Sequence, residues 1–334
     1  MSGEARCPVD VLTGFLGAGK TSLLRRLIAE GALRDTAVLV NEFAALPVDD
    51  RLVAIAGAPV GLIGEGCICC VTDVNLRAAL IGLLDARERG AMPPFSRVLI
   101  ETSGLADPGA ILAALAADPM LKARLSAGRV VTLVDLMHGE ATLDDSAEAI
   151  AQIVAADAVF FTKQAGADSG AAARLSQRIA SLNPLAAILP ERVEDPFAWP
   201  LPDAGGVVRH RALRRFEAAP AETRHGGIAA GLLTAAAPVE WSRFAAWLSL
   251  LLHRHGNAIL RVKGEVAIRG DGAVSAVMVQ SVRHVVHAPE HLARAEGTAL
   301  VVIARGLAPA AIEDSFRRHV TGEVGVDQQE RVAV

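Results

Sequence analysis

The chain has 334 residues, of which 52% are hydrophobic and 21% are charged, and its formal net charge is −4 at pH 7. This length predicts two domains of moderate size, and the slightly acidic charge with only 4% aromatic residues argues against nucleic acid as the main partner. No apolar run approaches the ~20 residues of a membrane-spanning helix, and the first residues lack the pattern of a secretory signal. We therefore expect a cytoplasmic protein with no membrane partner.

The first motif is a glycine-rich loop that fits a phosphate-binding site. The spacing G-x-x-x-x-G-K-[ST] occurs over residues 14–21, after an apolar strand that begins at Val9 and before an amphipathic helix. In such a loop, main-chain N–H groups surround phosphate oxygens, Lys20 reaches the β- and γ-phosphates, and Thr21 holds Mg²⁺. The alternative is a glycine turn without a ligand, which the flanking strand and helix disfavour. The loop residues predicted to bind the nucleotide are Gly14, Gly17, Ala18, Gly19, Lys20, Thr21 and Ser22.

Strands and helices alternate after this loop. Helices are predicted to begin near Asn75 and Pro108, and the short apolar runs that predict strands are 36–40, 60–63, 97–100, 130–134 and 158–161. This alternation predicts an α/β fold, a doubly wound and mostly parallel sheet of the P-loop NTPase type. Polar residues that follow these strands should then lie at the same edge of the sheet as the phosphate loop.

An acidic residue ends the strand at 97–100. Glu101 follows the strand directly and Gly104 lies three residues further on, which resembles the Walker B and switch II arrangement of P-loop GTPases. A carboxylate in this place can reach Mg²⁺ directly or through water, and the Gly104 N–H can sense the γ-phosphate. A helix N-cap is the alternative, and it fits Asp107 better than Glu101. The residues predicted to act in hydrolysis are Lys20, Thr21, Glu101 and Gly104.

A proline-rich stretch divides the chain. Prolines between 184 and 202 precede Asp203 and a glycine pair, so we expect a first domain over 1–200, a smaller α+β domain over 205–320 and a loose tail over 321–334. The elements predicted for the second domain are strands at 207–213, 258–262, 265–268, 274–282 and 299–303 and helices at 238–253 and 309–319.

Three of the four cysteines stand within four residues. Cys67, Cys69 and Cys70 offer thiolates at a spacing that suits a soft or borderline metal, with Zn²⁺ as the default. Cys67 and Cys70 can converge on one ion, and a further ligand could come from Glu42 or from a histidine. The alternatives are buried small hydrophobic residues and a redox-active pair.

Four segments in order, GFLGAGKT, VNEF, GCICC and IETSGLADP, resemble the CobW-like GTPases, a metal-handling group of P-loop proteins. The resemblance continues at residues 259–264 and 299–305. It implies a GTPase with slow intrinsic hydrolysis that binds GTP, Mg²⁺ and Zn²⁺ (or Co²⁺) and delivers the metal to a client metalloprotein. By position it implies a switch region containing Glu42 and Asp49, the CxCC metal motif over 67–70, and Glu101 with Gly104 as the Walker B and switch II pair.

The sequence departs from the family pattern at two positions. Family members commonly carry [NT]-K-x-D for guanine recognition, whereas this chain has Lys163 followed by Gln164 and Ala165. Lys163 remains a predicted nucleotide contact, but Ala165 lacks the carboxylate that accepts hydrogen bonds from guanine, so discrimination against adenine should weaken unless Asp168 replaces it. Ala44 replaces the glycine of N-E-F-G.

Two other functional classes stay open from sequence. One is a non-catalytic metal-binding or scaffold protein with a drifted nucleotide site, and the other is a P-loop ATPase or kinase that acts on a small molecule. Histidines of the second domain are scattered, and a second metal site, if present, would be sought at His284, His287 and His291.

Overall fold

The chain folds into two compact units, Met1–Leu201 and Pro202–Val334. The computed structural model describes residues 6–40, 60–62, 73–199, 227–269, 274–292 and 297–322. No helix within these ranges is both long and apolar enough to cross a membrane.

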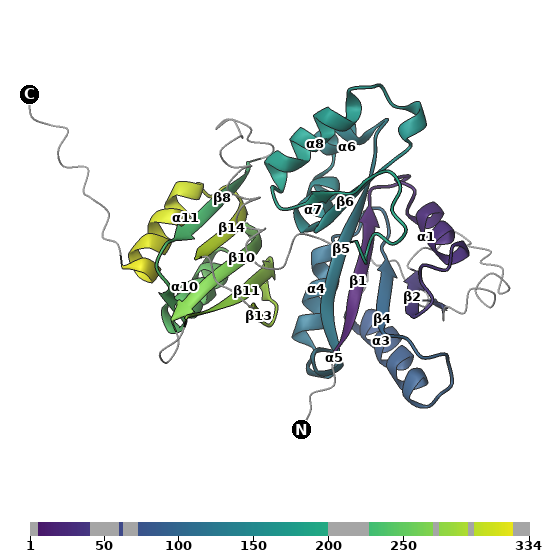
Figure 1. The fold of residues 1–334 in the computed structure, drawn as a ribbon, viewed down its shortest axis with the longest axis horizontal. Coiled ribbons are helices and arrows are strands. Elements are labelled where there is room, and N and C mark those ends of the chain that lie inside the picture. Colours follow the sequence, from purple (N-terminus) through teal and green to yellow (C-terminus); the bar gives the residue numbers. More distant parts are fainter. Residues whose placement is uncertain are drawn as a thin grey trace, which may run out of the picture. The chain divides into compact units, whose positions relative to one another are not determined.

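The first unit is built on a parallel sheet in the order β3-β2-β4-β1-β5-β6-β7 (Figure 1). All of its described strand pairs are parallel. Its strands are β1 (Cys7–Gly14), β2 (Thr36–Val40), β3 (Val60–Leu62), β4 (Arg97–Glu101), β5 (Leu125–Asp135), β6 (Ala158–Thr162) and β7 (Ala187–Ile188). Every residue of β2 is buried, as expected of a strand that helices cover on both faces.

Helices connect these strands. They are α1 (Lys20–Ala29), α3 (Asp73–Glu88), α4 (Pro108–Ala117), α5 (Pro119–Arg124), α6 (Gly139–Asp145), α7 (Ala147–Ala155) and α8 (Ala171–Leu182). Leu12 of β1 packs in one buried cluster with Leu24 and Leu27 of α1, which holds the first helix against the sheet. The predicted cap of α4 is present, since the Asp107 carboxylate accepts a 2.8 Å hydrogen bond from Gly109 N. The predicted P-loop NTPase fold class is confirmed.

The second unit has a sheet in the order β12-β11-β10-β14-β8, with β13 beside β11 and β9 beside β10. Its pairs are antiparallel except for β9 with β10. The elements are β8 (Ile228–Ala235), β9 (Val239–Glu240), α10 (Trp241–His255), β10 (Ile259–Arg269), β11 (Val274–Val282), β12 (Val285–Val286), β13 (Glu290–Leu292), β14 (Thr298–Arg305) and α11 (Pro309–Phe316), which continues as a π-helical turn (Arg317–Thr321). Trp247 of α10 meets Phe316 edge to face at 5.2 Å, and both lie in the core of this unit. The predicted smaller α+β domain is thus confirmed.

The strands of the second unit differ from the prediction. The expected strands 258–262 and 265–268 form one strand, β10, because Gly264 does not interrupt it. A Cβ at Gly264 would lie 2.1 Å from Ala299 O, so this glycine permits close approach of β14 and makes no turn. Strand β8 was not predicted, because its sequence is poor in β-branched residues. The predicted strand 207–213 and the tail after 322 lie outside the described residues.

Candidate nucleotide site

Four neighbouring strands of the parallel sheet end in polar residues or glycine. β1 ends at Gly14, β4 at Glu101, β5 at Asp135 and β6 at Thr162. Because the strands are parallel and adjacent, these four residues share the carboxyl edge of the sheet, where α/β proteins bind ligands.

The phosphate loop runs from Gly14 to the start of α1. Gly17 and Gly19 adopt φ angles of 73° and 92°, and Ala18 N donates a 3.1 Å hydrogen bond to Phe15 O, which closes a tight turn. Gly19 occupies the N-cap of α1 and supplies no side-chain cap, and the first turn of this helix has no acidic residue. The first N–H groups of α1 are therefore left for an anion, and the helix dipole favours one there.

Lys20 lies inside this loop. Its side chain is 7% exposed, and Nζ donates to Gly14 O at 2.8 Å and to Phe15 O at 3.3 Å. The ammonium group is thereby held within the curve of the phosphate loop. Ser22, in contrast, is exposed on the surface of α1.

Thr21 and Glu101 meet at the edge of the loop. Thr21 Oγ1 donates a 2.8 Å hydrogen bond to Glu101 Oε1, and Glu101 is 1% exposed. A hydroxyl and a carboxylate are the oxygen ligands that Mg²⁺ prefers, and within the described ranges the buried hydroxyl of nearby Ser103 makes no hydrogen bond. The residues present thus fit Mg²⁺, which would neutralise charge on the β- and γ-phosphates when bound.

The Gly104 loop, Ser103 to Ala106, packs directly against the phosphate loop. Ala106 N donates to Ser103 O at 3.2 Å, which forms a turn with Gly104 at its centre. A Cβ at Gly104 would lie 2.7 Å from Leu16 N, so only glycine fits without a shift of main chain. Gln152 of α7 donates hydrogen bonds to the carbonyls of Gly104 and Ala106 in this loop, and sequence reasoning missed it because no local motif marks a glutamine in a helix.

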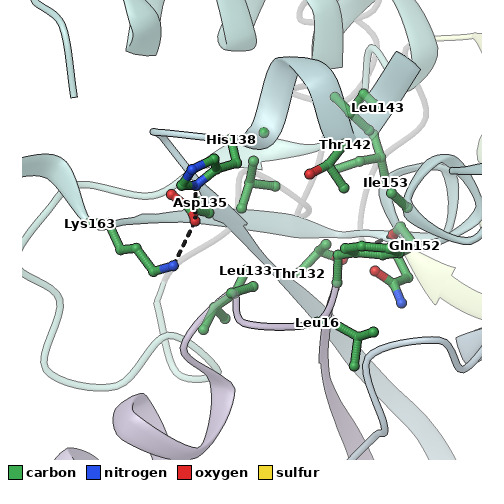
Figure 2. A pocket seen from close by; sticks show the side chains of 15 residues that line it. Leu16, Thr132, Leu133, Asp135, His138, Thr142, Leu143, Gln152, Ile153 and Lys163 are labelled. Atoms are coloured by element: carbon green, nitrogen blue, oxygen red, sulfur yellow. Dashed lines mark hydrogen bonds and ion pairs between the residues drawn. The ribbon is translucent and has the colours of Figure 1, made fainter. Parts of the chain in front are cut away.

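Lys163, predicted as a nucleotide contact, lies at the end of β6 with φ at 57°. Its Nζ donates to Asp135 Oδ2 at 2.7 Å, and His138 Nδ1 lies 3.1 Å from the same oxygen (Figure 2). Burial acts to raise the pKa of Asp135, but the hydrogen bonds from Lys163 and His138 outweigh it and lower the pKa. Asp135 follows the strand predicted at 130–134, and its place at this edge confirms the prediction that polar residues after these strands lie beside the phosphate loop.

Thr162 connects β6 to the phosphate loop. Its Oγ1 donates a 2.8 Å hydrogen bond to Ala18 O, 144 residues earlier in the chain. Ala165 follows in a short 3₁₀ turn (Gln164–Gly166) and is exposed. Asp168, considered as a replacement for the missing carboxylate, instead accepts hydrogen bonds from Arg174 at 2.8 and 3.2 Å, which lowers the pKa of Asp168.

A cavity of about 210 Å³ lies beside the phosphate loop, between β5, α6 and α7. Figure 2 shows the Asp135, His138 and Lys163 group on one side of it and Gln152 with Leu16 on the other. Apolar side chains also line the cavity, those of Leu133, Leu143 and Ile153. The cavity is therefore lined by polar groups in one part and by hydrophobic side chains in another.

The predicted metal ligands lie elsewhere in the chain. Glu42, Cys67, Cys69 and Cys70 fall outside the described residues, as do Asp49 and Ala44. Within the described ranges, no three His, Cys, Asp or Glu side chains come together in a way that could hold a metal ion. The described geometry therefore concerns the nucleotide and Mg²⁺ part of the prediction.

Two family models match the chain. Residues 8–190 match the CobW/HypB/UreG nucleotide-binding domain, and residues 228–320 match the cobalamin synthesis protein cobW C-terminal domain. The chain belongs to the CobW/HypB/UreG family. Within this family, the phosphate loop, Glu101 and Lys163 all lie in the nucleotide-binding domain.

Individual relatives agree with this assignment. The zinc chaperone YjiA of Escherichia coli is 32% identical over 269 residues, covering 79% of this chain and 82% of YjiA. The zinc chaperone CobW of Pseudomonas aeruginosa is 29% identical, covering 94% and 91%. The zinc-regulated GTPase metalloprotein activator 1 of Schizosaccharomyces pombe is 33% identical over 190 residues, or 54% of this chain and 45% of that protein. The crystal structure of zinc-bound YjiA GTPase from E. coli superposes with a TM-score of 0.72 at 25% identity, covering 95% of this chain and 99% of that one.

Proposed function

We propose that this CobW-family protein is a GTP-hydrolysing zinc chaperone that binds Zn²⁺ and transfers it to a client metalloprotein. The observation that carries the nucleotide part is the hydrogen bond between Thr21 and Glu101 beside the buried ammonium of Lys20. A hydroxyl and a carboxylate that can bind Mg²⁺ lie together with an ammonium group that can bind phosphate, at the N-terminus of α1. A bound nucleoside triphosphate with Mg²⁺ requires these groups. The names of the relatives support zinc as the metal.

Each residue of the site has a separate task in this proposal. The N–H groups of the loop and of the first turn of α1 bind the β-phosphate, and Lys20 neutralises charge shared by the β- and γ-phosphates. Glu101 orients the Thr21 hydroxyl and lies within reach of the metal shell. Gly104 offers a main-chain N–H near the γ-phosphate. The sequence shows no identifiable glutamine or arginine finger that would act on the attacking water, so we expect slow intrinsic hydrolysis.

Zinc is the cargo, and we assign it to Cys67, Cys69 and Cys70 with Glu42 as a further ligand. Three thiols that must stay reduced to bind zinc favour a reducing compartment, and we place the protein in the cytoplasm on that ground. The segment with Glu42 follows β2 and the cysteines precede α3, so both segments adjoin elements of the nucleotide domain. Binding of GTP and binding of zinc should then be linked: GTP changes the affinity of the protein for zinc, and zinc changes its affinity for GTP by the same factor.

The decisive experiment measures Zn²⁺ affinity by chelator competition with no nucleotide, with GDP and with a non-hydrolysable GTP analogue. The proposal expects different zinc affinities with GDP and with the analogue, loss of tight binding in Cys69→Ser, and loss of phosphate release in Lys20→Ala. Cys7→Ser is the matched control, because Cys7 is a buried thiol at the start of β1 that contacts Ser96 O at 3.3 Å.

Three results would contradict parts of the proposal. Zinc affinity that does not depend on nucleotide would overturn the linkage. Phosphate release that survives Lys20→Ala would place hydrolysis outside this loop. Equal loss of zinc in Cys7→Ser and Cys69→Ser would remove the assignment of the metal to the cysteine cluster.

A further inference from the structure

Gln152 is a neutral polar side chain that is almost completely buried in α7. It is 1% exposed, and its Nε2 donates to Gly104 O at 3.0 Å and to Ala106 O at 3.1 Å. Both amide hydrogens of Gln152 are therefore used, and both bind the Gly104 loop. One side chain thus holds two main-chain carbonyls that flank Leu105.

The main chain of Gln152 is itself anchored to the sheet. Thr132 Oγ1 of β5 donates a 2.9 Å hydrogen bond to Gln152 O. Gly104 also lies so close to Leu16 of the phosphate loop that an added Cβ would stand 2.8 Å from Leu16 Cα. Gly104 therefore contacts both the phosphate loop and an amide whose backbone is bound to β5.

We propose that Gln152 is a positioning residue that fixes the Gly104 loop against the phosphate loop and thereby sets how strongly this protein distinguishes GTP from GDP. This inference rests on the proposed function. GTP and GDP differ in the γ-phosphate, and the Gly104 N–H can bind that group only when the loop is correctly placed. Loss of the two hydrogen bonds would therefore weaken GTP binding and leave GDP binding unchanged.

Packing of Leu105 does not replace these hydrogen bonds, although Ala106 beside it is buried. Leu105, the residue between the two bound carbonyls, is 45% exposed and contributes little burial. The carbonyls of Gly104 and Ala106 are bound from the α7 side. Without the donors of Gln152, two buried acceptors would lose their partner and the loop would gain freedom to move.

The first test is Gln152→Leu, which keeps most of the side-chain volume and removes both donors. Affinities for GDP and for a non-hydrolysable GTP analogue are measured by titration, together with kcat for GTP hydrolysis. We expect the affinity for the GTP analogue to fall ~10-fold, which corresponds to about 1.4 kcal/mol of binding free energy, and kcat to fall by a similar factor. The affinity for GDP should stay within about twofold of wild type.

The second test is Gln152→Glu, which has nearly the same shape. A carboxylate facing two carbonyl oxygens in a buried place is destabilised, whereas a protonated carboxyl can donate one hydrogen bond. The kcat of this variant relative to wild type should therefore rise as pH falls from about 8 to about 6. Gln152→Leu should show no such rise, which separates positioning from general structural damage.

The matched control is Asn183→Ala. Asn183 is also buried, and its amide donates to Ile153 O and Ala156 O at 2.8 Å and to Val154 O at 3.1 Å, at the C-terminal end of the same helix and without contact to the Gly104 loop in these hydrogen bonds. It should lower stability and leave the ratio of analogue to GDP affinity unchanged.

The outcomes separate this inference from the proposed function. An unchanged affinity ratio in Gln152→Leu, or the same change in Asn183→Ala, would overturn the inference while wild-type hydrolysis still supports the proposed function. Absence of GTP hydrolysis in the wild-type chain would overturn both.

Discussion

Thr21 and Glu101 stand 80 residues apart in the chain, and the hydroxyl of the first donates a 2.8 Å hydrogen bond to the carboxylate of the second. The contact exists because β1 and β4 are parallel neighbours, with Leu12 paired to Glu101, so that the start of α1 and the end of β4 meet at one edge. Removal of the carboxylate charge tests its importance. Glu101→Gln should lower Mg²⁺-dependent GTP hydrolysis by about 10- to 100-fold, the usual effect of losing a group that orients a metal ligand.

Steady-state phosphate release at several Mg²⁺ concentrations measures this effect. Glu313→Gln in α11 of the second unit is the charge-matched control, since Glu313 forms a surface ion pair with Arg317. Hydrolysis by Glu101→Gln at the wild-type rate and with the wild-type Mg²⁺ dependence would show that Glu101 has no role in the metal site.

Gly104→Ala should displace the Gly104 loop from the phosphate loop. Its Cβ would lie 2.7 Å from Leu16 N. Overpacking of this kind lowers the free energy of unfolding by about 1–3 kcal/mol. We expect a lower free energy of unfolding and weaker binding of a GTP analogue. Gly82→Ala in α3 is the control, because a Cβ there meets nothing within 4 Å and should stabilise the helix by about 0.5–1 kcal/mol. Wild-type analogue affinity in Gly104→Ala would contradict the prediction.

Asp10 gives the protein a specific dependence of stability on pH. Burial is the main reason that the pKa of Asp10 is raised from 3.8 to about 6, and the Arg129 N–H and the Arg97 and Arg129 guanidinium groups only partly offset it. The folded state favours the protonated form of Asp10. The contribution of Asp10 to the free energy of unfolding is therefore complete below about pH 3.8 and is lost as pH rises through about 6. The shift corresponds to roughly 3 kcal/mol.

Asp10→Asn removes this titration. The free energy of unfolding of the variant minus that of wild type should increase by about 3 kcal/mol as pH rises from about 4 to about 7. This change does not depend on the absolute stability of the variant. Urea unfolding at several pH values gives the two curves. Curves that run parallel over this range would show that Asp10 does not titrate as described.

Ala165→Asp should restore preference for guanine over adenine. The side chain of Ala165 is exposed in the 3₁₀ turn that follows β6, so an added carboxylate would remain solvated until it accepts hydrogen bonds from the base. We expect the ratio of GTP to ATP affinity to rise by about 10- to 100-fold. Fluorescent-nucleotide competition measures the ratio, and Ala172→Asp at an exposed position of α8 controls for the added charge. An equal ratio in wild type and Ala165→Asp would show that this position does not contact the base.

The amino-acid sequence by itself determined the fold class and predicted which segments bind the nucleotide. The phosphate loop, Glu101 and Gly104 could be recognised because each belongs to a short motif in which spacing along the chain defines the chemistry. The buried strands could be recognised because burial on both faces requires continuous apolar runs, as in β2. β10 could not be delimited, because Gly264 breaks strands in general and permits a close approach here.

Only the tertiary structure decided which side chains from distant segments meet. Asp168 and Gln152 are both polar residues without a motif, yet Asp168 is bound by Arg174 and Gln152 binds the Gly104 loop. Sequence reasoning could not separate their roles, because a hydrogen bond depends on positions and directions that many residues of the fold set together. For the same reason, the motif at 14–21 predicted the nucleotide site from sequence. Only the packing of α7 on the sheet determined which residue holds the Gly104 loop in place.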